Sequence, residues 1–153
     1  MHAAVRGMIA PSRRRRPTQP APGILVVDDD PVALAITTSA LQHYGFTVFA
    51  ATTAIDAFLQ IEREPAIALT VIDIVLPGID GLMLADMIKV RHRDMRIIYA
   101  TGFPEVVAQQ PGYRYGPVLA KPVEPSALET AVRAALARPP DRFGHRPRDE
   151  QPH

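Results

Sequence analysis

The sequence predicts an α/β fold in which helices cover both faces of a five-stranded parallel sheet. Short apolar runs alternate five times with segments of helical periodicity. The runs are largely apolar rather than alternating, which is typical of strands buried on both faces. Because 153 residues suit one domain, we expect all five strands in one doubly wound sheet joined by crossover helices.

Each predicted strand is a short apolar run that ends at a polar or turn-forming residue. The five runs comprise residues 23–27, 46–51, 67–72, 96–100 and 118–120. The first run ends at Asp28, the third at Asp73, the fourth at Thr101 and the fifth at Lys121. Since the carboxyl ends of parallel strands meet at one edge of a sheet, we expect these polar side chains to converge there.

The predicted helices begin at capping residues or prolines and end near glycine or proline. They comprise residues 31–43, 54–64, 81–91, 104–109 and 125–137. Asp30 and Thr53 are the expected N-caps of the first two helices, and Gly45 follows the first. The fourth helix is only one or two turns long, and an irregular segment follows it at 110–117.

Two of these helices carry a clear apolar stripe that should face the core. The stripe expected on 81–91 consists of Leu82, Ala85, Met87 and Ile88. The stripe expected on 125–137 consists of Leu128, Val132, Ala135 and Leu136. The methionines and leucines between 82 and 88 are all expected in the core.

Charge is unevenly distributed, although the formal net charge is only +1. Residues 1–22 carry five arginines and no acid, residues 23–138 carry a net charge of −4, and residues 139–153 are neutral. We expect a domain at 23–138 between disordered tails at 1–22, which is rich in arginine and proline, and at 139–153. Neither tail has the apolar periodicity that offsets ordering entropy, and we expect the arginines to be solvated rather than bound to nucleic acid.

Several classes of site and protein are excluded by composition. The chain has no cysteine, so it has no disulfide, thiolate zinc site or cysteine nucleophile. No apolar run approaches the roughly 20 residues that a membrane span needs. These features fit a reducing compartment, and a cytoplasmic location is expected.

The polar residues at the strand ends point to metal-assisted phosphoryl chemistry. Asp28, Asp29 and Asp73 would repel one another at one sheet edge unless a cation lay among them. Oxygen-only ligands favour Mg²⁺, with Mn²⁺ as a second choice. The Thr101 hydroxyl and the Lys121 ammonium could then bind the oxygens of a phosphoryl group transferred to a carboxylate. Lysine is rare in this chain, since 15 of its 17 basic residues are arginine.

Four segments in this order resemble the receiver domain of bacterial two-component response regulators, the CheY-like proteins. They are ILVVDDDP at 24–31, VIDIVLPGIDG at 71–81, IIYATG at 97–102 and VLAKP at 118–122. The resemblance covers about residues 23–138. It implies a flavodoxin-like doubly wound sheet with strand order 2-1-3-4-5.

The resemblance also implies a role for each residue at the strand ends. Asp73 would be the phosphoacceptor, and it would hold Mg²⁺ together with Asp28, Asp29 and the backbone carbonyl of Val75. Thr101 would be the switch hydroxyl, and Lys121 would bind the phosphoryl group. The peptide bond before Pro122 would be a candidate for the cis form. The phosphoryl donor would be a sensor histidine kinase or a histidine phosphotransferase.

The chain departs from the usual receiver pattern at three places. Val118 stands where the family usually has an aromatic residue that couples to the switch threonine, and Tyr113 and Tyr115 are the candidates to replace it. The segment after Thr101 is rich in proline and glycine, as in stand-alone receivers with a short fourth helix. Val75 and Phe103 cannot hydrogen-bond an attacking water, which predicts a long-lived phosphoryl group.

Two other readings of the same residues remain open. A haloacid-dehalogenase-like phosphatase also has an Asp-x-Asp strand end, a threonine and a lysine, but that reading leaves Asp73 unexplained. A non-phosphorylated interaction module with the receiver fold is the third reading. The expected protein is a single-domain response regulator and a signalling phosphoacceptor rather than an enzyme, with no DNA-binding domain, acting through an unknown downstream target.

Overall fold

The computed structural model describes residues 21–109 and 115–139. In these residues five strands form one parallel sheet in the order β2-β1-β3-β4-β5, as predicted. The strands are β1 (Gly23–Val27), β2 (Thr47–Ala51), β3 (Ile67–Asp73), β4 (Arg96–Thr101) and β5 (Val118–Ala120). The helices are α1 (Pro31–His43), α2 (Ala54–Arg63), α3 (Gly81–Arg91), α4 (Pro104–Gln109) and α5 (Pro125–Ala137).

Some of the predictions fall outside these residues. Almost all of the two expected tails, at 1–22 and 139–153, lies outside the described part of the chain. The same holds for residues 110–114 of the expected irregular segment, including Tyr113. Its remaining residues, 115–117, belong to no helix or strand, and α4 is short as expected.

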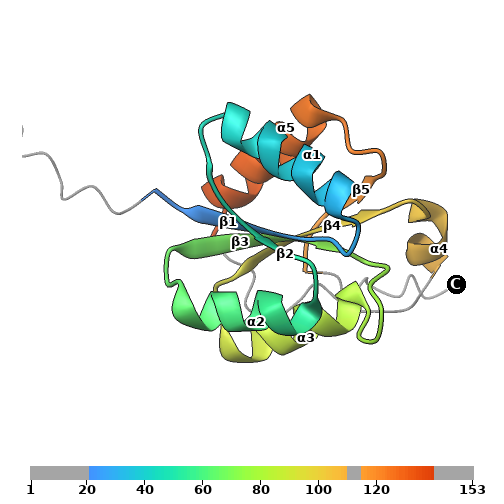
Figure 1. The fold of residues 1–153 in the computed structure, drawn as a ribbon, viewed down its shortest axis with the longest axis horizontal. Helices are drawn as coiled ribbons and strands as arrows, with labels where there is room; N and C mark the ends of the chain where they lie inside the picture. Colours follow the sequence, from blue (N-terminus) through green and yellow to red (C-terminus); the bar gives the residue numbers. More distant parts are fainter. Residues whose placement is uncertain (1–20, 110–114, 140–153) are drawn as a thin grey trace, which may run out of the picture.

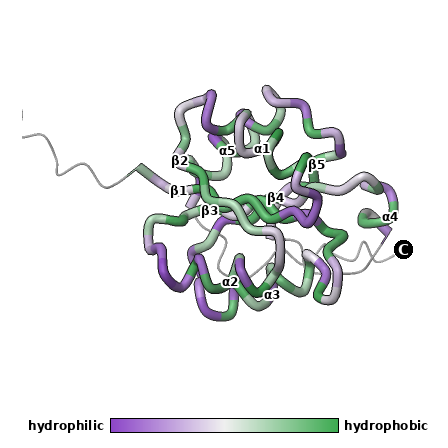
Figure 2. The backbone as a smooth tube through the Cα atoms, viewed as in Figure 1, coloured by the Kyte–Doolittle hydropathy of each residue, from purple (hydrophilic) through white to green (hydrophobic). Residues whose placement is uncertain are grey.

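The sheet is the middle of three layers. Figure 1 shows α1 and α5 on one face of the sheet and α2 and α3 on the other. The apolar strands run through the centre, and the hydrophilic residues lie on the surrounding helices and loops (Figure 2). Two apolar clusters fill the space on either side of the sheet, with Tyr99 in one and Ile98 in the other. Side chains therefore alternate between the two layers along each strand.

Strand burial follows position in the sheet. All five residues of β1 are buried, and six of the seven in β3 are buried, because helices cover both faces of these inner strands. The edge strand β2 is mostly exposed or half-buried. It begins at Thr47 rather than at the predicted Phe46, which directly follows the turn at Tyr44 and Gly45 and pairs with no residue of β1.

Helix starts follow the capping residues in the sequence. The Asp30 carboxylate accepts from the Val32 N–H at 2.9 Å, and the Thr53 hydroxyl accepts from the Asp56 N–H at 3.1 Å. Such caps satisfy backbone donors that the first helical turn leaves unpaired. Gly45 ends α1 with a φ of 89°, which a residue with a side chain rarely adopts.

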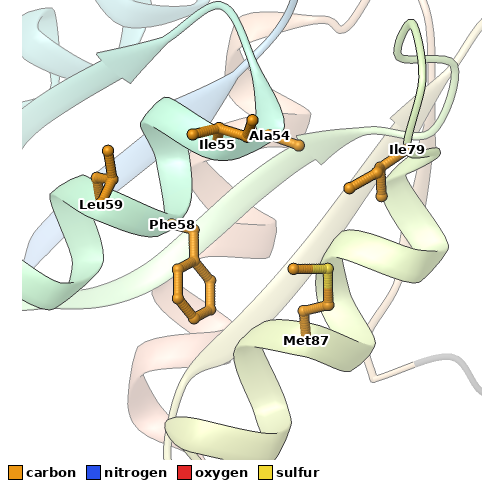
Figure 3. Close-up of a pocket in the computed structure, with 6 residues that line it drawn as sticks. All are labelled: Ala54, Ile55, Phe58, Leu59, Ile79 and Met87. Carbon is orange, nitrogen blue, oxygen red and sulfur yellow. The ribbon is translucent and has the colours of Figure 1, made fainter.

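The predicted core face of α3 is partly wrong. Met87 is 42% exposed and Met83 is 54% exposed, whereas Leu84, which was not in the predicted stripe, is fully buried. Met87 instead lines a small apolar hollow of about 110 Å³ between α2 and α3 (Figure 3). Apolar residues lie on several sides of α3. The spacing of these residues alone therefore selects a face that is offset by about one residue from the face that is buried.

The structure contains no candidate membrane segment among its described residues, because none of these helices combines the length and the hydropathy of a span.

Candidate functional site

Three carboxylates meet at the carboxyl edge of the sheet, as the strand ends predicted. Asp28 and Asp29 follow β1, and Asp73 ends β3, the neighbouring strand. One oxygen of each carboxylate lies within 4.8 Å of the others. Asp28 and Asp73 are buried, with 4% and 7% exposed, whereas Asp29 is exposed. The cluster therefore has two fixed inner carboxylates and one that faces solvent.

Lys121 lies between the two buried carboxylates. Its Nζ donates to Asp28 Oδ2 and to Asp73 Oδ2, each at 2.8 Å. The lysine follows β5, which is separated from β3 by β4, so its side chain reaches across the end of β4. Its main chain is held there, because the Lys121 N–H donates to the Thr101 carbonyl at 2.8 Å. The peptide bond from Lys121 to Pro122 is cis.

Backbone donors occupy the remaining oxygens of these two carboxylates. The Asp30 N–H donates to Asp28 Oδ1 at 2.9 Å, and the Val75 N–H donates to Asp73 Oδ1 at 3.0 Å. Each bond spans two residues and closes a short turn at the end of its strand. The carboxylate orientations are thus fixed by main chain on one side and by Lys121 on the other.

The loop after Asp73 is packed tightly against the start of α3. The Gly81 N–H donates to the Ile74 carbonyl at 2.8 Å. A Cβ at Gly81 would overlap the Asp73 carbonyl oxygen and would lie 2.7 Å from Ile74 Cα. Only glycine therefore allows the helix to start this close to the backbone of Asp73.

Thr101 lies at the end of β4, between the strands that carry Asp73 and Lys121. It is only 1% exposed, and its Oγ1 accepts from the Phe103 N–H at 3.1 Å. A hydroxyl has one hydrogen of its own to donate as well. The bond to Phe103 joins the Thr101 hydroxyl to the segment that leads into α4.

Burial sets the protonation behaviour of the Asp73 carboxyl. Burial raises the pKa of Asp73 above its usual range, and the charge on Asp28 adds to this effect, while Lys121 and the Val75 N–H only partly oppose it. Burial disfavours the charged form of Lys121, but the hydrogen bonds to Asp28 and Asp73 outweigh it and raise the lysine pKa. Lys121 is therefore firmly cationic beside a carboxyl that protonates more easily than an ordinary aspartate.

This raised pKa predicts how Asp73 affects stability. A carboxyl whose pKa is raised by folding destabilises the folded state once the pH rises above its pKa in the unfolded chain. The loss of stability is complete when the pH exceeds its pKa in the folded protein. In EDTA, we expect Asp73→Asn and wild type to have similar melting temperatures below the usual aspartate pKa. The variant should gain an advantage as pH rises through the range just above it.

Thermal unfolding of both proteins across that pH range measures the difference. Asp56→Asn provides the control, because it removes a carboxylate from an exposed position of α2, outside the acidic cluster. An Asp73→Asn advantage that shrinks as pH rises would contradict the raised pKa.

The donor set fits a hard divalent cation. The clustered ligand atoms are all carboxylate oxygens, which is the ligand type that Mg²⁺ prefers, and the exposed Asp29 gives solvent access for the waters that Mg²⁺ retains. Asp28 and Asp73 oxygens each already accept one hydrogen bond but retain a further lone pair for a metal.

Comparison with known proteins identifies the family of this chain. The sequence profile described as the response regulator receiver domain matches residues 24–133. The chain belongs to the receiver-domain family of two-component response regulators. Its sheet order is the CheY-like one.

Curated relatives of the chain support the same family. The chain is 31% identical over 117 residues to the probable transcriptional regulator ycf27 of Pyropia yezoensis, covering 75% of this chain and 47% of that protein. It is 33% identical to the regulatory protein VanR of Enterococcus faecium, with coverage of 75% and 50%. The receiver thus spans about half the length of the curated relatives it matches.

Solved structures give the same assignment. A CheY-like receiver from Methanospirillum hungatei superposes with a TM-score of 0.64 and is 31% identical, covering 76% of this chain and 94% of that one. The Thermotoga maritima response regulator TrrA, solved with Mg²⁺ and BeF, gives a TM-score of 0.68 at 25% identity, with coverage of 74% and 98%.

Sequence reasoning missed two residues that shape the receiver. Gly81 was assigned only as the first residue of a helix, although it sets the distance between α3 and Asp73. Lys89 was given no role, yet it is 6% exposed and its Nζ donates to the carbonyls of Arg93 and Met95 at 2.7 and 2.9 Å. The rarity of lysine was the one available signal for Lys89.

Proposed function

We propose that this receiver accepts a phosphoryl group on Asp73 from a phosphohistidine of a sensor histidine kinase or a histidine phosphotransferase. The observation that carries the proposal is the position of Lys121, whose Nζ is 2.8 Å from Asp28 and from Asp73. A lysine held between a buried acceptor carboxylate and a second acid at a strand edge provides positive charge where phosphoryl oxygens would gather.

The transfer itself exchanges one bond to phosphorus for another. An Asp73 carboxylate oxygen attacks phosphorus in line, a P–O bond forms, and the P–N bond to the donor histidine breaks with its electron pair left on the imidazole. Lys121 would neutralise charge on the equatorial oxygens. The fixed backbone bonds to Asp73 and Asp28 hold the carboxylates in place during this step.

Mg²⁺ would be held by Asp28, Asp29, Asp73 and the carbonyl of Val75, and Mn²⁺ could replace it. When bound, the metal would supply further positive charge for the phosphoryl oxygens. Asp29 is the best placed of the acids to reach it from the solvent side, because it alone of the three is exposed. This chemistry would place the chain in the cytoplasm, with the donor histidine.

The signal would pass through Thr101 to the face around β4 and β5. If Thr101 turns to donate to a phosphoryl oxygen, its bond with the Phe103 N–H changes, and the start of α4 responds. Val118 offers no aromatic ring for the usual coupling. Of the two candidates to replace it, Tyr115 is the one among the described residues. Its hydroxyl donates to Asp86 at 2.8 Å, and its N–H donates to the Tyr99 hydroxyl at 3.3 Å. The downstream target would then bind this changed face.

Incubation with acetyl phosphate tests the proposal. We expect a single Mg²⁺-dependent phosphorylated species in a phosphate-affinity gel, and none when EDTA is present. Steady hydrolysis of p-nitrophenyl phosphate would instead indicate the phosphatase reading. A protein that neither takes phosphate nor changes its spectrum with beryllofluoride and Mg²⁺ would be an interaction module.

The phosphoryl group is expected to be long-lived. Val75 and Phe103, each two residues after a site residue, are 60% and 65% exposed and carry no group that could position an attacking water. An amide introduced there could orient water, as a glutamine does in other phosphoryl-transfer sites. We expect Val75→Asn to shorten the phosphoryl lifetime, as followed by the gel over time after removal of acetyl phosphate. Loss from wild type within seconds in Mg²⁺ buffer would contradict this account.

A further inference from the structure

An open groove runs along the outer edge of the sheet, beside β5 and α5. Its volume is about 1,080 Å³, and it extends from Ser126 near the start of α5 to Arg138 just beyond its end. The small side chains of Ala127, Ala131 and Ala134 line the side formed by the helix. Side chains of this size leave room beside the edge strand that larger ones would fill.

The strand beside this groove has an unpaired edge. β5 is the last strand of the described sheet and pairs only with β4. The Pro117 carbonyl accepts from the Tyr99 N–H at 2.9 Å, and the Lys121 N–H donates to the Thr101 carbonyl at 2.8 Å, so these alternate residues face β4. The main-chain groups of Val118 and Ala120 therefore point away from the sheet, where a further strand could pair with them.

The groove is basic at one end. Lys89, Arg96 and Arg138 line it, and no acidic residue does so among the described residues. Arg96 Nε is buried and has no hydrogen-bond partner in the described part of the chain. Within the same residues, Arg96 Nη2 donates only to the Arg138 carbonyl, at 2.9 Å. Neither arginine forms an ion pair with any described residue. The two guanidinium groups thus retain donors suited to carboxylates.

We propose that this groove binds an extended acidic segment of a partner protein. The segment pairs with the free edge of β5 as an additional strand, its small apolar side chains lie against the alanines of α5, and its carboxylates reach Arg96 and Arg138. Main-chain pairing supplies affinity and the arginines supply the preference for acid. The basic end lies at the amino end of β4, at the sheet edge opposite Asp73, so the inference does not rest on the proposed phosphorylation.

A labelled peptide of about seven residues tests the proposal by fluorescence anisotropy, with Val, Val, Glu and Glu at alternate positions and Ser between them. Alternate side chains of a strand share one face, so the Val and Glu residues can all face α5 and the two arginines. We expect wild type and Asp73→Asn to bind the peptide equally, with an affinity that falls as salt is raised. Arg138→Glu and Arg96→Gln should each weaken binding about tenfold. Arg63→Glu, the same charge reversal at the exposed end of α2 on the opposite face, should change it by less than about twofold.

Two further peptides test the pairing mode. N-methylation of alternate residues, in each of the two registers, should abolish binding in one register and spare it in the other. Equal loss of binding in both registers or in neither would overturn the proposal. So would equal binding of the same peptide with Lys in place of Glu. An equal effect of Arg63→Glu, or no binding up to about 1 mM peptide, would also overturn it. So would tighter binding of an oligothymidylate lost in Arg138→Glu, which would indicate nucleic acid instead.

Discussion

We expect Lys121→Ala to lower the rate of phosphorylation by acetyl phosphate by about a hundredfold, the cost typical of removing one preorganised donor from a developing negative charge. In the native site the ammonium is 2.8 Å from both buried carboxylates. Without it, charge on the phosphoryl oxygens would be balanced by metal alone. Rates measured by phosphate-affinity electrophoresis at saturating Mg²⁺ test this expectation.

Lys121→Arg tests whether the positive charge alone is sufficient or whether the compact shape of the ammonium group is also needed. A planar guanidinium keeps the positive charge but cannot place one compact ammonium between Asp28 and Asp73. We expect a rate between those of wild type and Lys121→Ala, with the fold unchanged by circular dichroism. A rate for Lys121→Ala within about threefold of wild type would contradict the role assigned to the lysine.

Gly81→Ala should destabilise the receiver by about 3 kcal/mol or more, because overpacking against backbone cannot be relieved by a change of rotamer. The new Cβ would overlap the Asp73 carbonyl and lie 2.9 Å from Ile72 Cγ2. Either α3 moves away or the Asp73 loop shifts. We therefore expect both a lower free energy of unfolding in urea and slower phosphorylation of the molecules that remain folded.

Gly102→Ala is the matched control. Gly102 follows Thr101 at the same sheet edge, but a Cβ there would meet nothing within 4 Å. We expect this variant to unfold within about 1 kcal/mol of wild type. A similar decrease in the free energy of unfolding in both variants would mean that chain flexibility, rather than the contact with Asp73, explains the effect of Gly81→Ala.

The meeting of the site residues was predictable because it follows from topology. Asp28 and Asp73 are far apart in sequence, but each ends a buried strand, and parallel strands bring their carboxyl ends to one edge. The same rule placed Lys121 and Thr101. Local signals of capping and helix termination gave the helix starts correctly, as for Asp30 and Thr53.

What could not be predicted depends on contacts through space. The two bonds of Lys121 require a particular side-chain conformation that no local pattern specifies. The contact of Gly81 with Asp73 depends on how closely α3 approaches the end of β3. In α3, apolar residues occur on several sides, so the periodicity did not distinguish the buried Leu84 from the exposed Met87.

The central claim, that Asp73 carries the phosphoryl group, is tested most directly by intact-protein mass spectrometry after incubation with acetyl phosphate and Mg²⁺. Wild type should gain one phosphoryl group per chain, and Asp73→Asn should gain none. Asp80→Asn should remain a full acceptor, because Asp80 caps α3 outside the acidic cluster and asparagine caps a helix equally well. Stoichiometric labelling of Asp73→Asn, or loss of labelling in Asp80→Asn alone, would contradict the account.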